Sequence, residues 1–120
     1  MNNYIQIYNN ALSDDYCDEL KEKFESCSYN ESFEQGPMSF SQINLNQHPE
    51  WEADVKKLTT KFTKYISQYE QDCAITPEMW PSSYAFEEMR LKRYLSNGKD
   101  EFRPHVDAIT PASAIRFLVF

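Results

Sequence analysis

The spacing of apolar side chains changes at a loop bounded by prolines, Pro77 to Pro81. Before this loop, two stretches repeat apolar residues at the spacing of an α-helix. After it, from Tyr84 to Leu95, apolar and polar side chains alternate as they do along a strand. Helices followed by strands are typical of the α+β class, and 120 residues are enough for one such domain.

Both predicted helices begin at recognisable residues. Ser13 is a favourable N-cap, and the two aspartates that follow it complement the positive end of the helix dipole. The apolar positions of this first helix are Cys17, Leu20, Phe24 and Cys27. The second helix begins at Pro49, and its apolar stripe is longer: Trp51, Val55, Leu58, Phe62, Tyr65, Tyr69 and Cys73. Residues 28 to 47 predict a loop with one short strand at about Met38 to Ile43.

Four further segments have the composition of extended chain. Tyr4 to Tyr8 predicts a short first strand, and Tyr84 to Leu95 predicts a strand that leads into a turn at Asn97-Gly98. Phe102 to Asp107 predicts another extended segment, and the apolar run Ile115 to Phe120 predicts a buried strand. In the strand before the turn, we expect Met89 and Leu91 on one face. Arg90, Lys92 and Tyr94 would share the other, polar face and line a cavity.

Composition argues against several classes of function. A net charge of −7 and a pI near 4.8 disfavour nucleic-acid binding, which requires clustered Lys and Arg. The sequence contains no leader-like N-terminus and no apolar run that could span a bilayer, so it predicts a soluble cytoplasmic protein. Its three cysteines lack C-x-x-C spacing, which disfavours a disulfide framework or a structural zinc site. A small-molecule or peptide substrate is the expected partner.

His105 and Asp107 are the candidate metal ligands. Two residues apart on extended chain, they share one face, so an imidazole nitrogen and a carboxylate oxygen can meet on one ion. Such a pair suits the 2-His-1-carboxylate triad of non-heme Fe(II) oxygenases. His48 is the only other histidine, but its place before a helix start is more typical of a cap or a loop residue.

The residues around this pair follow a wider pattern. A strand ending in Tyr94 leads through the turn at Gly98 to Phe102-Arg103-Pro104-His105-Val106-Asp107, and Arg116 opens the next apolar run. This block closely resembles the core of the prolyl-4-hydroxylase-like family of Fe(II)/2-oxoglutarate dioxygenases. The helix start Leu12 to Cys17 is also similar to the entry of these enzymes.

The resemblance implies a fold and a set of roles. It implies a single domain over residues 1–120, with helical support at about 1–80 packed on an incomplete double-stranded β-helix, a cupin-like jelly roll, at about 84–120. His105 and Asp107 would be Fe(II) ligands, and Tyr94 would donate a hydrogen bond to 2-oxoglutarate. Phe102 matches the aromatic position before the ligands, and Arg116 matches an arginine whose role stays open.

The implied reaction consumes 2-oxoglutarate and O₂, releases succinate and CO₂, and hydroxylates a prolyl residue of a protein or peptide, or a small molecule. Similar enzymes often use ascorbate. The family's later histidine ligand and its basic residue for the far carboxylate of 2-oxoglutarate have no counterpart in the sequence. We therefore expect the chain to be the N-terminal portion of such an enzyme.

Other readings of the same residues remain open. The chain could be a catalytically inactive remnant or subunit that binds a partner, or itself, through an uncovered strand at Ile115 to Phe120. It could also be a small β-domain in which His105 and Asp107 hold a different ion. Arg90 and Lys92 could be ordinary surface charges, and Tyr94 could be a core aromatic.

Overall fold

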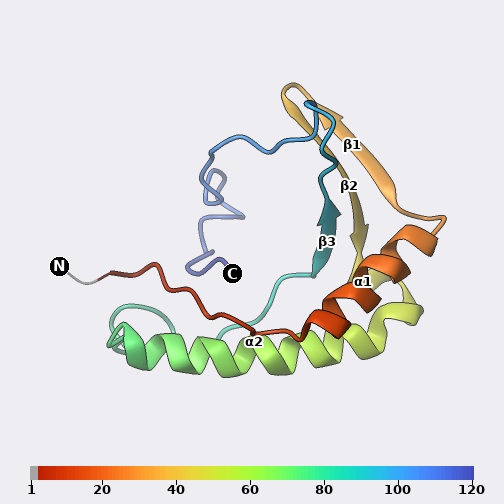
Figure 1. The fold of residues 1–120 in the computed structure, drawn as a ribbon. Helices are drawn as coiled ribbons and strands as arrows, with labels where there is room; N and C mark the ends of the chain where they lie inside the picture. Colours follow the sequence, from red (N-terminus) through yellow and green to blue (C-terminus); the bar gives the residue numbers. More distant parts are fainter. Residues whose placement is uncertain (1–2) are drawn as a thin grey trace.

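The computed structural model describes residues 3 to 120, which contain two α-helices and one three-stranded antiparallel sheet (Figure 1). In chain order the elements are α1 (Asp14–Ser26), β1 (Glu31–Gln35), β2 (Met38–Asn44), the 3₁₀ turns η1 (Leu45–Gln47) and η2 (Pro49–Trp51), α2 (Glu52–Asp72) and β3 (Arg90–Arg93). Helix α2 forms the base of the molecule, and the sheet rises from one end of it beside α1 (Figure 1). The predicted mixture of helices and strands is confirmed.

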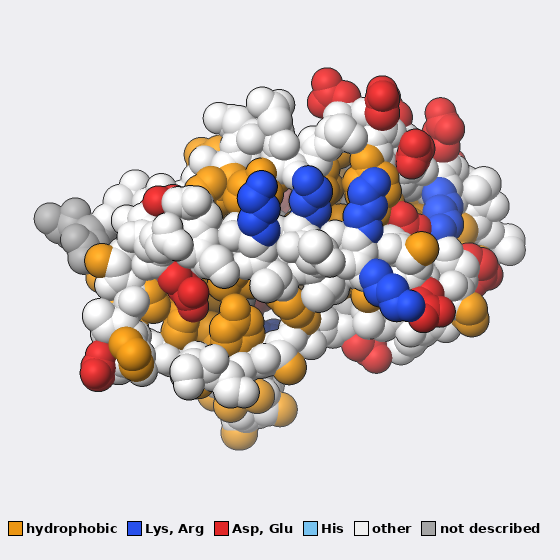
Figure 2. Space-filling view, turned by 90° about the horizontal axis from the view of Figure 1, so that it is seen from below, with side chains coloured by type: hydrophobic (Ala, Val, Ile, Leu, Met, Phe, Trp, Pro, Cys, Tyr) orange, Lys and Arg blue, Asp and Glu red, His pale blue; other side chains and the backbone are white. Residues whose placement is uncertain are grey.

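The two helices begin where the sequence predicts. The Ser13 hydroxyl caps α1 by accepting a hydrogen bond of 3.2 Å from the Tyr16 amide. Pro49 opens η2, which leads directly into α2. The face below α2 carries a row of basic side chains (Figure 2), as expected for the solvated side of an amphipathic helix. No helix within residues 3–120 combines the length and the apolar character needed to cross a membrane.

The sheet has the order β1-β2-β3. Strands β1 and β2 form a hairpin around Gly36, whose φ of +56° belongs to the left-handed region that glycine adopts without strain. The sequence did not predict β1, because its five residues are mostly polar and four of them are exposed. Strand β2 matches the strand expected at Met38 to Ile43, and it pairs on its other side with β3.

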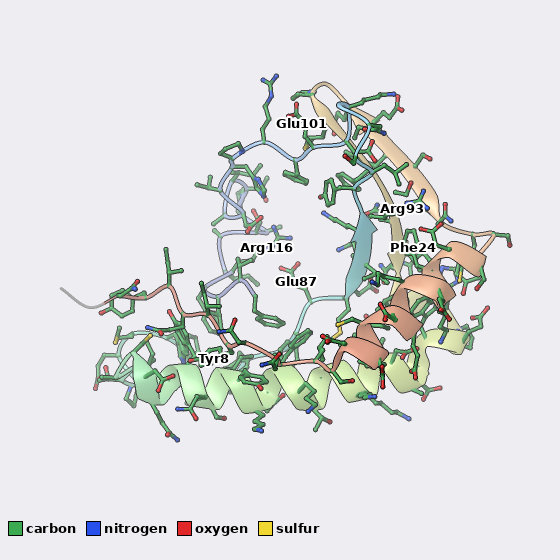
Figure 3. The ribbon with its side chains drawn as sticks, viewed as in Figure 1. Tyr8, Phe24, Glu87, Arg93, Glu101 and Arg116 are labelled. Carbon is green, nitrogen blue, oxygen red and sulfur yellow. The ribbon has the colours of Figure 1, made fainter. Side chains whose placement is uncertain are left out.

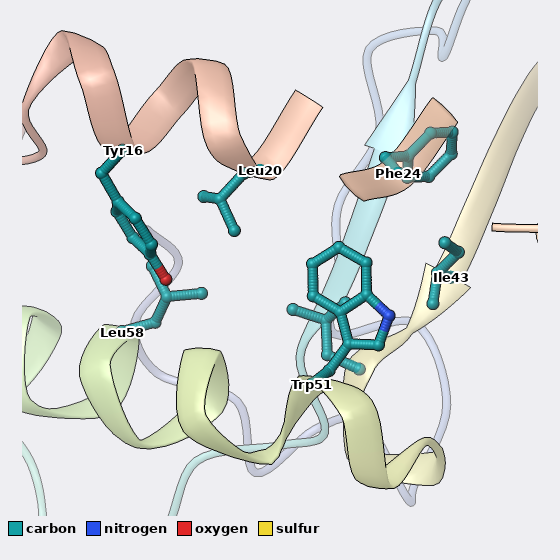
Figure 4. Packing of buried hydrophobic residues seen from close by; sticks show 7 residues of the cluster. Tyr16, Leu20, Phe24, Ile43, Trp51 and Leu58 are labelled. Atoms are coloured by element: carbon teal, nitrogen blue, oxygen red, sulfur yellow. The ribbon is translucent and has the colours of Figure 1, made fainter. Parts of the chain in front are cut away.

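The core lies where α1, the start of α2 and the sheet meet. Trp51 is fully buried at its centre, and Ile43, Leu45 and Phe24 are 1%, 2% and 3% exposed (Figure 4). The Trp51 indole N–H donates a hydrogen bond of 3.0 Å to the Tyr29 hydroxyl, so the ring is buried without losing its polar partner. One large aromatic side chain therefore joins both helices and the sheet.

A polar cluster links α1 to α2 at the edge of this core. Asp54 accepts a hydrogen bond of 2.8 Å from the Tyr16 hydroxyl and lies 2.7 Å from the Lys23 ammonium. Burial by itself would raise the pKa of Asp54, but the hydrogen bonds from Lys23 and Tyr16 outweigh it and lower that pKa. The carboxylate stays ionised and holds both α1 side chains.

The prediction of a strand at Tyr4 to Tyr8 is wrong. These residues form no ladder with the sheet and instead run along α2. The Tyr69 hydroxyl donates to the Tyr4 carbonyl at 2.7 Å, and the Tyr8 hydroxyl donates to Asp72 at 2.8 Å. Partial burial and the neighbouring Asp72 raise the pKa of Tyr8 to about 12. The aromatic residues that suggested a strand are used for packing on a helix.

The predicted C-terminal strands also need correction. Of the strand expected from Tyr84 to Leu95, only Arg90–Arg93 pairs in the sheet. Neither Phe102 to Asp107 nor Ile115 to Phe120 forms a strand, and only an isolated bridge between Ser39 and Glu101 extends the pairing. The run expected to be buried is open to solvent, with Ile115 81% and Phe120 63% exposed. Apolar composition favours extended chain, but a strand also requires a neighbouring edge to pair with.

Candidate functional site

The predicted ligand pair is brought together. His105 Nε2 lies 3.2 Å from Asp107 Oδ1, on the segment that follows the bridge between Ser39 and Glu101. Metal–ligand distances for nitrogen and oxygen are about 2.0 to 2.2 Å, so two ligands at a right angle around one ion lie about 3 Å apart. The two side chains are 46% and 37% exposed, which leaves the site accessible from solvent. The pair therefore has the spacing of adjacent ligands on a single ion.

The backbone fixes the tautomer of His105. Its Nδ1 lies 2.7 Å from the Arg103 carbonyl oxygen, and a carbonyl can only accept, so Nδ1 carries a proton. In the neutral ring, Nε2 then carries no proton, and its lone pair faces the Asp107 carboxylate. Two acceptors at this distance repel unless a proton or a cation lies between them. Holding one ring nitrogen in this way is also how proteins orient histidine ligands.

Aromatic rings connect this pair to the sheet. Phe102 packs on the His105 ring with centroids 4.1 Å apart, and it stacks on Phe40 of β2 at 5.8 Å. Tyr94 lies against the same Phe40 ring at 5.4 Å. Burial raises the pKa of Tyr94, so its hydroxyl remains protonated and can donate a hydrogen bond. Phe40 was not among the predicted site residues, because it lies more than fifty positions before its aromatic neighbours.

One basic side chain, Lys92, lies over the same rings. The Lys92 ammonium lies 4.6 Å from the Phe40 ring centroid and 4.9 Å from that of Phe102. Partial burial is the largest cause that lowers the pKa of Lys92, and the nearby Arg90 lowers it further, while Asp107 acts in the opposite direction. Lys92 and Tyr94 thus share one face of the chain, as the alternation predicts.

Arg116 links the C-terminal segment to Glu87 and to the backbone of Asp107; Figure 3 shows Arg116 and Glu87. Its guanidinium forms a two-point ion pair with Glu87, at 2.5 Å from Nε to Oε1 and 2.9 Å from Nη2 to Oε2. A third nitrogen donates 3.0 Å to the backbone carbonyl of Asp107. The ion pair raises the pKa of Arg116 and lowers that of Glu87. No local pattern in the sequence marks Glu87, which precedes Arg116 by 29 positions.

His48 does not join the site. Its ring stacks on Tyr29 with centroids 4.0 Å apart, next to the core residue Trp51. Within residues 3–120, no group of three or more His, Cys, Asp or Glu side chains is arranged to hold a metal. His105 and Asp107 are thus a pair of candidate ligands in the part of the chain that the structure describes.

Comparisons of the chain with protein-family models, with curated proteins and with solved structures give no match. The chemistry of residues 87 to 116 and the contacts described above therefore carry the functional interpretation.

Proposed function

We propose that the chain carries part of the site of an Fe(II)- and 2-oxoglutarate-dependent dioxygenase of the prolyl-4-hydroxylase type. The observation that supports this most is the 3.2 Å separation of His105 Nε2 and Asp107 Oδ1, with Nδ1 of the same ring tied to the Arg103 carbonyl. A hard carboxylate oxygen and an imidazole nitrogen are ligands that suit Fe(II). Under this proposal the cation relieves the repulsion between the two facing acceptors.

Each neighbouring residue has a role in the proposed site. Tyr94 donates a hydrogen bond to 2-oxoglutarate, and Phe102 shields the His105 ring from water on one side. Arg116 holds the backbone of Asp107 and thereby orients its carboxylate. When bound, Fe(II) supplies the chemistry that couples decarboxylation of 2-oxoglutarate by O₂ to hydroxylation, and ascorbate keeps the metal reduced. The substrate is a prolyl residue of a protein or peptide, or a small molecule.

The proposed fold extends the one described above. Strands β2 and β3 would be the beginning of a double-stranded β-helix, and α1 and α2 would be the helical support of its outer face. The antiparallel pairing of β2 with β3 and the packing of Ile43 against Trp51 and Phe24 are compatible with this arrangement. The remaining ligand and the anchor for the far carboxylate of 2-oxoglutarate are not assigned to residues of this chain.

A different observation favours the alternative of a catalytically inactive subunit that binds a partner. Ile115, Val119 and Phe120 belong to one six-residue run and are 81%, 70% and 63% exposed, and exposed apolar residues can mark an interaction surface. This alternative makes no use of His105 or Asp107. A metal-dependent reaction that requires those side chains would therefore distinguish the two proposals.

Succinate formation tests the proposed reaction. We expect purified protein with Fe(II), ascorbate and 2-oxoglutarate in air, with imidazole added to occupy a free metal position, to release succinate faster than the same mixture without protein. His105→Ala should return the rate to that of free iron, because one of the two ligands is lost. His48→Ala is the matched control, since it removes the only other histidine. Equal rates for wild type and His105→Ala would rule out the proposed site.

A further inference from the structure

The segment that carries the two candidate ligands is held at both of its ends. At the upstream end, Glu101 forms a backbone bridge with Ser39 of β2, and both hydrogen bonds are 3.0 Å long. At the downstream end, the Ser113 amide donates to the carbonyl and hydroxyl oxygens of Thr110, both at 3.1 Å. The turn made in this way brings the Arg116 side chain back to the ligand segment.

Glu87 fixes the guanidinium of Arg116 at this downstream end (Figure 3). Its two carboxylate oxygens accept hydrogen bonds of 2.5 and 2.9 Å, and such a two-point pair sets the plane of the guanidinium. The remaining nitrogen, Nη1, donates to the Asp107 carbonyl at 3.0 Å. Because Glu87 lies just before β3, which begins at Arg90, it connects the ligand segment to the sheet.

Glu87 also offsets a positive charge that opposes metal binding. Arg116 interacts electrostatically with Asp107, so an unpaired guanidinium would attract that carboxylate and repel a cation bound to it. The pair with Glu87 neutralises Arg116 and directs its third nitrogen to the backbone of Asp107. The Asp107 carboxylate therefore stays available to a metal ion.

We propose that Glu87 is a positioning residue for the metal site, which acts through Arg116 to hold Asp107 in place and to keep its carboxylate available to a divalent cation. The inference rests on metal binding by His105 and Asp107, as in the proposed function, but it requires neither 2-oxoglutarate nor turnover. It adds to the metal site a residue that precedes β3 and is not itself a ligand.

Zn(II) binding, measured by competition with a chromophoric chelator, tests this inference. We expect Glu87→Gln to weaken binding by about tenfold or more, as is typical when a group that supports a metal ligand is lost. Glu25→Gln is the matched control, because Glu25 also pairs with an arginine, Arg93, and both glutamate side chains are 58% exposed. This control should bind Zn(II) as wild type does. Equal losses of affinity in the two variants would overturn the inference.

A background that lacks Arg116 tests whether Glu87 acts through it. In protein that already carries Arg116→Met, adding Glu87→Gln should leave the Zn(II) affinity nearly unchanged, because the residue that transmits its effect is gone. A loss as large as in the wild-type background, or wild-type affinity in Glu87→Gln alone, would overturn the inference. If His105→Ala loses Zn(II) binding and Glu87→Gln does not, the metal site of the proposed function stands and this inference fails.

Discussion

Replacing Trp51 with alanine is expected to destabilise the protein by about 3 to 5 kcal/mol, the range found when a buried tryptophan is truncated. Trp51 is fully buried among residues of α1, β2 and α2, and it donates a hydrogen bond to Tyr29. The substitution would leave a cavity at the point where both helices meet the sheet, and it would remove the hydrogen bond from the Trp51 indole to the Tyr29 hydroxyl. Urea unfolding followed by circular dichroism measures the loss.

Trp80, the other tryptophan, provides the control. It lies in a loop, is only partly buried, and contacts Glu70, Tyr69 and Phe117. Trp80→Ala should therefore cost clearly less than Trp51→Ala. Similar losses for the two variants would show that the centre of the core is not at Trp51.

Removing His105 should have the largest effect on metal binding. Loss of groups that only support a metal ligand typically lowers affinity about 10- to 100-fold, so loss of a ligand itself should lower it by at least about a hundredfold. Equilibrium dialysis with anaerobic Fe(II) would compare wild type with His105→Ala. The free energy of unfolding should change little, because the side chain is 46% exposed.

His48→Ala is again informative, because it removes an imidazole of identical chemistry that stacks on Tyr29 near the core. It should lower stability and leave Fe(II) affinity unchanged. Retention of Fe(II) by His105→Ala, or its loss in His48→Ala, would place the metal elsewhere.

The helices could be predicted because the signals that specify them are local. Ser13 caps α1 through an amide three positions later, and Pro49 initiates the turn that leads into α2. The apolar stripe of each helix is also read within a few turns of the chain. These features do not depend on what the helix packs against.

The strands were predicted less well because pairing is not local. Alternation correctly placed Lys92 of β3 and the following Tyr94 against the same Phe40 ring, but it could not show that only Arg90–Arg93 has a partner. Strand β1 was missed because its residues are polar, and it exists because the turn at Gly36 folds it onto β2. The exposed run Ile115 to Phe120 shows the converse, since its apolar composition did not suffice to make a strand.

In the candidate site, too, contacts between neighbours in the sequence could be predicted, and contacts between distant residues could not. His105 lies 3.2 Å from Asp107, although the strand from which their shared face was predicted does not form. The ion pair of Arg116 with Glu87 and the approach of Lys92 to Phe40 join residues that are far apart in sequence. Only the folded chain brings these groups together, and they surround the ligand pair with charge and apolar surface.

The imidazole nitrogens of wild-type protein offer the most direct test of the metal site. The protein has only two histidines, so ¹⁵N NMR can follow each ring during a titration with Zn(II), a diamagnetic substitute for Fe(II). We predict that Nδ1 of His105 is protonated without metal, that Zn(II) shifts its Nε2, and that the signals of His48 do not move. A His105 ring protonated only on Nε2, or one that does not respond while His48 does, would contradict the proposed site.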